Sequence, residues 1–367
     1  MRRLRLLLQA IRHNEQGQIV VLLGLLMTVL MGFTAMAVDV GSMASDKSGL
    51  QNAADAMALA AAQDLPDASA ANTSAREWAT KNGVDPNEIE SIQIQPQSLP
   101  SVPNPRVTVS LKRQHDFAFA KALGINSTDI EATASAIKTS FGGGDGIVPW
   151  TVTEAAMLNV IPGALATLKY DAKDGENGNY GPISIDGTGA KTYEETIIDG
   201  CQSTICSEAA VLQGCLTNAP ECDGAQCSTE PGNMIGPTRD GVDYRMNNTD
   251  SACNTFEKVF ASNGNGTFRF NSNGNGAQEC NPFVQGPWSK SSLRVIIVPV
   301  IHELCDGKCM VTITGFALFY LEGYDSGKCS GNSCEIKGKF VKANITTGGL
   351  VGVYDPNSMI QFVKLVQ

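Results

Sequence analysis

The sequence predicts an α+β protein with an N-terminal transmembrane helix that continues into an Ala-rich helix, a small α+β unit, and a mostly β, disulfide-rich exported domain. Three observations predict this order. Residues 17–38 form an uncharged apolar run, and an Ala-rich stretch with helical spacing of its apolar residues follows. All eleven cysteines lie later, between Cys201 and Cys334, among short β-type segments.

Charge is distributed unevenly along the chain. Four arginines against Glu15 give residues 1–16 a net charge of +3, so the remainder carries −13 of the overall −10. Binding to phosphate backbones needs a basic surface. The acidic bulk therefore argues against nucleic acid as a partner.

The apolar run is long enough to cross a membrane. Residues 18–38 number 21, and about 20 apolar residues span a bilayer core. Arginines precede the run and Asp39 follows it, so the positive-inside rule predicts a cytoplasmic tail over residues 1–17 and an exported remainder. The lipid bilayer is thus a predicted partner through residues 18–38. Cleavage as a secretory signal after Ala37 stays open, although the run exceeds the usual signal core of about 7–15 residues.

An extended Ala-rich helix is expected over residues 39–65, with Pro66 as its stop. Ala has the highest helix propensity, and the apolar residues trace one helical stripe. Two interpretations stay open: the stripe packs on the chain's own exported part, or on copies and partners. Its members are Val40, Met43, Leu50, Ala54, Met57, Ala61 and Leu65.

The N-terminal segment resembles TadE/TadG-like proteins of the Tad (Flp) pilus-assembly family. The resemblance covers residues 12–62 and rests on the boundary Glu15-Gln16-Gly17-Gln18, the apolar span, the exit Ala37-Val38-Asp39-Val40-Gly41 and the helix Leu50-Gln51-Asn52-Ala53-Ala54-Asp55-Ala56. It implies an envelope protein that assists or joins a thin adhesive pilus. Two departures stand out. Leu22 occupies the place of the Glu that pilin-type processing requires, and the D-x-S-x-S motif of long relatives is missing.

A small α+β domain is expected over residues 66–140. Residues 66–73 are expected to be a linker, and residues 74–82 a helix with Ser74 as N-cap and Glu77 as its capping-box partner. Strands are predicted at 89–95, 106–112 and 130–137, with a helix at 116–123 that turns Phe117, Ala120 and Phe119 inward. By analogy, this order is compatible with a pilin-like fold. The Gly-rich residues 141–146 are expected to form a hinge.

Residues 147–367 are expected to form a mostly β, disulfide-bonded exported domain. The cysteines lack the C-x2-C pairs typical of zinc sites, which favours disulfides in an oxidising compartment. Cys305 and Cys309 lie on the turn between two strongly β-type segments, where a disulfide would clip the connection. The eleventh cysteine is expected to be free or paired between chains. Strands are predicted at 165–170, 267–270, 293–301, 310–321 and 336–342.

No segment carries a recognisable catalytic, cofactor or metal motif. His302 beside Glu303 lacks the H-E-x-x-H pattern and a G-x-S-x-G partner, so a surface histidine is expected. The Gly-rich residues 142–146 lack the Lys-Ser/Thr of a P-loop. The acidic residues 171–176 do not match EF-hand spacing. We therefore predict no catalytic residues, no cofactor and no metal.

The sequence as a whole favours a non-enzymatic, single-pass membrane protein that assists or anchors a Tad/Flp-type adhesive pilus through protein contacts. Its partners would be pilus-assembly proteins or pilin subunits, with a homo-oligomer as a further option. Two alternatives stay open. The anchor could tether an exported hydrolase or ligand-binding module, or the chain could be a stand-alone surface adhesin.

Overall fold

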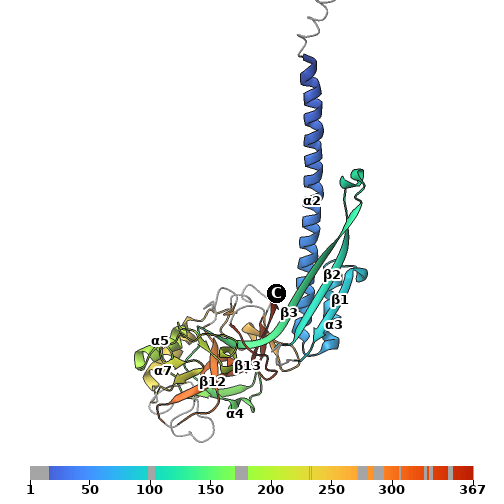
Figure 1. Cartoon of the computed structure of the whole chain (residues 1–367). Coiled ribbons are helices and arrows are strands. Elements are labelled where there is room, and N and C mark those ends of the chain that lie inside the picture. Colours follow the sequence, from blue (N-terminus) through green and yellow to red (C-terminus); the bar gives the residue numbers. More distant parts are fainter. Residues whose placement is uncertain are drawn as a thin grey trace, which may run out of the picture. The chain divides into compact units, whose positions relative to one another are not determined.

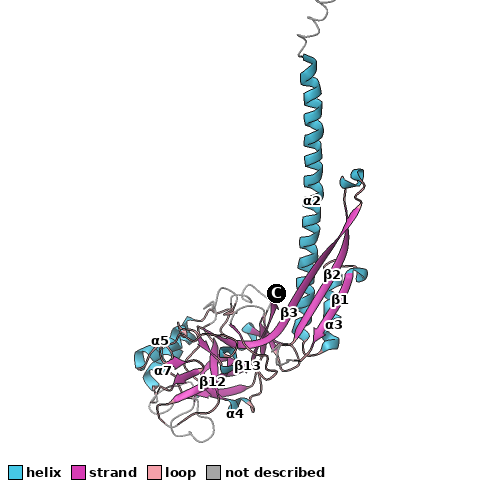
Figure 2. Cartoon of the chain, viewed as in Figure 1, coloured by secondary structure: helices cyan, strands magenta, loops and turns pink. Residues whose placement is uncertain are grey.

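The computed structural model describes residues 16–97, 104–169, 181–230, 232, 234–271, 280–283, 293–305, 307–325, 329, 334–345 and 350–366. The chain divides into two compact units. The first unit contains residues 1–58, 73–93 and 108–135, and the second contains 59–72, 94–107 and 136–367. Figure 1 colours the elements along the chain and Figure 2 separates helices from strands.

One uninterrupted helix, α2 (Gln16–Asp64), begins the described chain. It combines the predicted span and the predicted Ala-rich helix, and it ends just before Pro66 as expected. The large apolar side chains from Ile19 to Val38 are all at least 46% exposed, whereas Leu50, Ala54, Met57 and Ala61 are fully buried. The helix therefore meets two environments, and its second half packs on the chain's own residues.

Helix α3 (Ala68–Lys81) follows and begins earlier than expected. The Asp67 side chain accepts hydrogen bonds from the backbone N–H groups of Ser69 (2.9 Å) and Ala70 (3.0 Å), so Asp67 is the N-cap. The prediction of Ser74 as N-cap, after a linker over 66–73, is therefore wrong. The Asp67 side chain satisfies backbone amides at the start of the helix, and Asp is a preferred N-cap residue. The Ala-rich sequence that follows can therefore become helical directly after Asp67.

Strands β1 (Ile89–Gln95), β2 (Arg106–Asp116) and β3 (Ser127–Gly144) lie side by side, preceded by the short helix η1 (Pro86–Glu88). In the first unit, side-chain hydrogen bonds such as Thr108–Ser135 (2.8 Å) link β2 and β3. Arg113 holds Glu88 with two hydrogen bonds, of 2.6 and 2.9 Å. These strands match the predicted segments, but β2 and β3 are longer.

Strand β3 continues through the glycines that were expected to break the chain. Gly142 and Gly143 lie in this strand, and Gly143 pairs with Cys206 of β6. A Cβ on Gly142 would lie 2.8 Å from the backbone N of Gly352. Close approach of neighbouring backbones explains these glycines better than a local break does. The expected end of the strand at Ile137 is therefore wrong.

The second unit contains two sheets. In one, the order β16-β14-β10-β9 continues from β3, with β6 and β15 also paired to β3. The other has the order β4-β11-β12-β13-β5, extended by β7 and β8. The strands are β4 (Val152–Thr153), β5 (Leu165–Lys169), β6 (Ile205–Cys206), β7 (Cys222–Asp223), β8 (Gln226–Ser228), β9 (Phe260–Ser262), β10 (Phe268–Phe270), β11 (Val295–Ile301), β12 (Met310–Tyr324), β13 (Ile336–Val341), β14 (Ala343–Ile345), β15 (Leu350–Val351) and β16 (Ile360–Val366).

All five strands predicted in this region are present, and helices were missed. The helices are α4 (Glu154–Met157), α5 (Ala190–Asp199), α6 (Glu208–Val211), α7 (Ile235–Asn248) and α8 (Phe256–Val259). Gly241 allows α7 to approach Ile197 of α5 closely. The fully buried Trp150 donates from Nε1 to the Tyr193 hydroxyl (2.7 Å), which lies 3.0 Å from Thr238 Oγ1. This buried polar chain fixes both helices.

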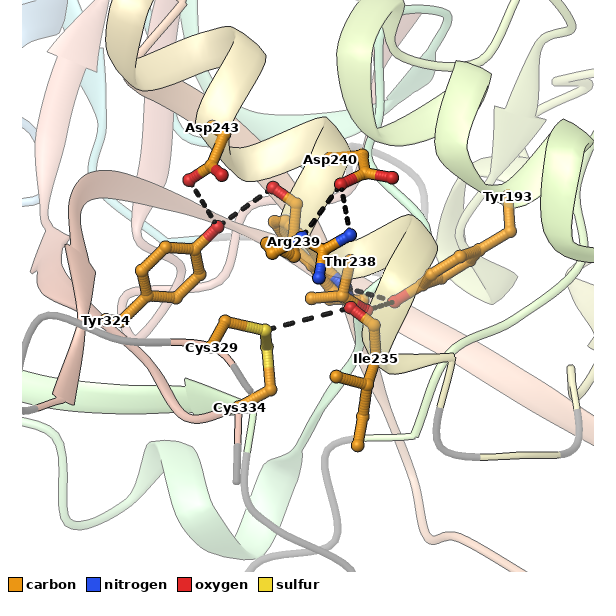
Figure 3. Close-up of a disulfide and its surroundings, with 10 residues drawn as sticks. Tyr193, Ile235, Thr238, Arg239, Asp240, Asp243, Tyr324, Cys329 and Cys334 are labelled. Atoms are coloured by element: carbon orange, nitrogen blue, oxygen red, sulfur yellow. Dashed lines mark hydrogen bonds and ion pairs between the residues drawn. A yellow bond between two sulfur atoms is a disulfide. The ribbon is translucent and has the colours of Figure 1, made fainter. Parts of the chain in front are cut away.

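Five disulfides hold turns of the second unit. They join Cys206–Cys215, Cys222–Cys227, Cys253–Cys280, Cys305–Cys309 and Cys329–Cys334. The predicted clip between β11 and β12 is thus present. In Figure 3 the Cys329–Cys334 disulfide lies against α7, beside Tyr324, whose hydroxyl donates to Arg239 O and lies 2.9 Å from Asp243 Oδ1. The fold is α+β, as predicted.

The eleventh cysteine, Cys201, is free and buried, with 1% of its surface exposed. Burial raises the pKa of its thiol to about 12, and only a thiolate reacts readily.

We therefore expect no thiol of the native protein to react with a maleimide. After unfolding without reductant, intact-mass measurement should show one modification per chain, and none in Cys201→Ser. Labelling of the native chain at Cys201, or a Cys201-linked dimer, would contradict this assignment.

Candidate functional site

The carboxylate of Asp39 is buried where α2 ends its apolar run. Asp39 is 4% exposed, whereas its neighbours Val38 and Val40 are 48% and 53% exposed. The loop between β2 and β3, residues 117–126 (the exit loop), covers it. This exit loop and the part of α2 that it contacts belong to the first unit.

Three consecutive backbone N–H groups of the exit loop donate to Asp39. Ala118 N lies 2.8 Å from Oδ1, Ala120 N lies 2.6 Å from Oδ2, and Phe119 N lies 3.1 Å from both oxygens. Burial by itself would raise the pKa of Asp39. The amides of Phe119, Ala120 and Ala118, with a smaller contribution from His115, outweigh burial and hold this pKa below its usual value. The carboxylate is therefore ionised at neutral pH and acts as a fixed acceptor.

The exit loop also satisfies much of its own backbone. It contains one short 3-10 helix, η2 (Ala120–Leu123), which ends at Gly124 with φ of 87°. Phe117 N donates to Asn126 O (3.0 Å), and Ile125 N donates to Ala120 O (3.1 Å). The predicted helix over 116–123 is thus only one short turn. The turn begins where the loop amides meet Asp39 of α2, which is 81 positions from Ala120 in the sequence. The residues around 116–123 therefore do not reveal this acceptor.

A second contact joins the same two elements. His115, at the end of β2, is 5% exposed. Its Nδ1 lies 2.7 Å from Asp46 Oδ2, and its Nε2 lies 3.4 Å from Ser42 Oγ. Ser42 and Asp46 are four residues apart on α2 and therefore lie on one face. The ring of Phe117 stacks edge-on against His115 at 5.4 Å.

Ser42, His115 and Asp46 have the order of a catalytic triad, but the geometry does not activate the serine. The accepting atom of a general base must lie about 2.6–3.2 Å from the atom that carries the proton, and here His115 Nε2 and Ser42 Oγ are 3.4 Å apart. Ser42 Oγ donates its only proton to Asp39 O at 2.9 Å. The nearby amides that could stabilise an oxyanion donate to Asp39 instead. The three residues therefore act as a structural clamp.

None of the site residues weighed in the sequence is a member of this clamp. The His302 side chain is 70% exposed, with Nδ1 3.0 Å from Glu154 Oε2, and this hydrogen bond raises the pKa of His302. It is a surface histidine, as expected. Residues 1–15 and 171–176 lie outside the described residues. Over the ranges that the structure describes, no three His, Cys, Asp or Glu side chains gather closely enough to hold a metal ion.

Sequence reasoning noticed Asp39 as part of an exit motif and did not notice His115, Ser42 or Asp46. Ser42 and His115 are 73 positions apart, and Asp39 and the amide of Ala120 are 81 apart. Nothing local marks such pairs. The available signal was a charged residue directly at the end of an apolar span, which needs a partner when it is buried.

By length and composition, α2 is a helix able to cross a membrane, and the cysteine-rich second unit carries five disulfides. These features define a class of protein: an α+β body behind an N-terminal apolar helix that suggests a membrane anchor.

Residues 17–64 match a protein-family model described as putative Flp pilus-assembly TadE/G-like. The predicted resemblance is confirmed for this segment, which coincides with α2. A TadE/G-like domain implies a role in Tad pilus assembly. No curated protein and no solved structure matches the chain.

Replacement of Asp39 tests the first contact. In Asp39→Asn one acceptor oxygen becomes an NH2 group that faces a loop N–H, and the negative charge is lost, so we expect hydrogen-exchange protection of residues 118–120 to fall by about tenfold or more. Mass spectrometry of peptides covering the exit loop, in detergent, measures this. Asp116→Asn, an exposed carboxylate nearby, is the matched control and should change little.

The lowered pKa of Asp39 also sets a pH dependence for the loop. Protection is complete above the ordinary carboxyl pKa and is lost as the pH falls through the folded value. After correction for intrinsic exchange rates, wild-type protection should decline in acid while that of Asp39→Asn stays flat. Equal pH profiles would contradict the role given to this carboxylate.

Proposed function

We propose that this chain is a membrane-anchored envelope protein that assists assembly or anchoring of a Tad/Flp-type adhesive pilus through protein–protein contacts. The observation that carries the proposal is the coincidence of the TadE/G-like match with a helix whose first half is apolar and unburied. An apolar helical surface of this length needs lipid or protein around it. The second half of the same helix packs into the body, so the anchor and the body are continuous.

The proposed arrangement has a cytoplasmic tail over residues 1–17, a span over 18–38 in the inner or sole membrane, and an exported remainder. The exported part comprises the helix to residue 65, a small domain to 140 and a domain over 147–367, and strand β3 runs on through Gly144 between them. Two observations support export. The tail is basic and the rest is acidic, and five disulfides favour an oxidising compartment.

Two other functions compete with this proposal. A tethered hydrolase would need an activated nucleophile, and the serine nearest a buried histidine already donates its proton to Asp39 O. A stand-alone adhesin would share the anchor and the disulfides, so it differs only in its effect on pili. Contact without catalysis agrees with a clamp in which His115 contacts Asp46 and the Ser42 proton is directed to Asp39 O.

Deletion of the gene tests the proposed function directly. We expect the deletion strain to lose assembled pili in electron micrographs and to attach poorly, and full-length protein should restore both. The matched control exports residues 39–367 behind an unrelated cleaved signal. It should fail to restore pili, because the anchor is missing. Normal pili with lost attachment would favour the adhesin, and normal pili with normal attachment would exclude both.

Orientation can be tested through the arginines. A C-terminal alkaline phosphatase fusion should be active, because that enzyme matures only where disulfides form. Replacement of Arg2, Arg3, Arg5 and Arg12 by Glu should lower this activity, because basic residues retain the tail in the cytoplasm. A Lys replacement of the same four positions preserves charge and is the control. Equal activity in the Glu and Lys variants would contradict the proposed orientation signal.

A further inference from the structure

The exit loop presents a cluster of apolar side chains to its surroundings. Phe119 is 51% exposed, Leu123 83% and Ile125 54%. Three large apolar residues thus lie unburied within seven positions. Apolar clusters of this kind on a short loop mark contact with a partner or a membrane.

The exit loop lies beside the apolar span itself. Phe119 and Ala122 line a groove whose other wall is α2, and Figure 1 shows the tip of the β2–β3 hairpin next to this helix. At a rise of 1.5 Å per residue, Ala35 lies about 6 Å and Met31 about 12 Å from Asp39, toward the membrane. The groove residues from α2 are Met27, Leu30, Met31, Gly32, Thr34 and Ala35.

The backbone of the exit loop is prepared for an environment poor in water. An unsatisfied backbone group costs several kcal/mol in lipid, on the order of the loss of a whole hydrogen bond. Here Asp39 accepts from residues 118–120, and the loop carbonyls accept from the amides of Phe117, Ala122, Gly124 and Ile125. A loop exposed only to water would not require this acceptor from the helix.

The polar residues of the loop suit the membrane surface. Lys121 Nζ lies 4.0 Å from Asp116 Oδ2, and both side chains are largely exposed. A lysine at this position can lay its aliphatic part along the apolar surface and direct its ammonium to lipid headgroups. The continuity of the loop with the lipid-facing surface of α2 favours lipid as the occupant over a partner protein.

We propose that the exit loop is a second membrane contact, which inserts Phe119, Leu123 and Ile125 at the boundary between headgroups and acyl chains of the leaflet where α2 emerges. This inference rests on the membrane anchoring in the proposed function. Interfacial segments bury their apolar face about 5–10 Å into this boundary, which agrees with the position of the loop near Ala35. The ionised Asp39 is then shielded from acyl chains by the amides that hold it.

Tryptophan quenching by lipids brominated on their acyl chains tests the proposal in proteoliposomes of the full chain. Leu123→Trp is the reporter, with Ile125→Trp as a second position in case the first fails to fold. Leu158→Trp is the matched control, because Leu158 is 84% exposed and belongs to the second unit. Leu30→Trp reports the anchor. Wild-type emission is subtracted from each.

We expect the tryptophans at 123 and 125 to shift to shorter wavelength and to lose most of their emission in brominated lipid, as at position 30. The control at 158 should keep its emission. Quenching at 30 with none at 123 and 125 would overturn loop insertion and leave the anchor intact. Protection of position 123 only when a second protein is added would also overturn it, in favour of a protein partner. No quenching at any position would refute the anchoring itself.

Discussion

The carboxylate of Asp39 lies at the end of the apolar run of α2 and is buried. The position of the exit loop and the lengths of β2 and β3 depend on this burial. An ionised group can be buried only where several hydrogen bonds replace its hydration. Three consecutive amides of the exit loop provide them, with donor–acceptor distances between 2.6 and 3.1 Å. The loop therefore has to lie against the helix at this level, and β2 and β3 must extend far enough to bring it there.

The same helix is stable in two different surroundings because its composition changes along its length. Up to Val38 the helix carries large apolar side chains that remain exposed, and from Leu50 onward small Ala residues line its buried side. Small residues allow strands and a second helix to approach closely. Ala also costs little conformational entropy on helix formation. Continuity of the helix then requires no special residue at the end of the apolar run, since the Asp39 side chain accepts from amides of the loop and not from its own helix.

Local signals explain what could be predicted from the sequence. Alternation placed the strand at residues 89–95, and β-branched runs placed β11 and β12, whose connection carries Cys305 and Cys309. Long-range choices could not be predicted. The parallel pairing of Ala343 with Ile360 and the burial of His115 against Asp46 depend on which segments meet. Polar helices such as α5 were missed because Gly-rich surroundings obscure their periodicity.

The clamp of Ser42, His115 and Asp46 shows why a list of residue types does not define a catalytic site. All three partners are present in the order of a triad, yet the hydroxyl proton is directed to Asp39 O and the neighbouring amides serve Asp39. The Asp39 carboxylate and the Ser42 hydroxyl are thus already engaged, the first with the loop amides and the second with the helix backbone. A site that binds a substrate needs polar groups that are available to contact it. A contact that only holds a loop on a helix does not. The contacts around Asp39 therefore hold the loop on the helix, and the proposal of a protein that acts through contacts is compatible with them.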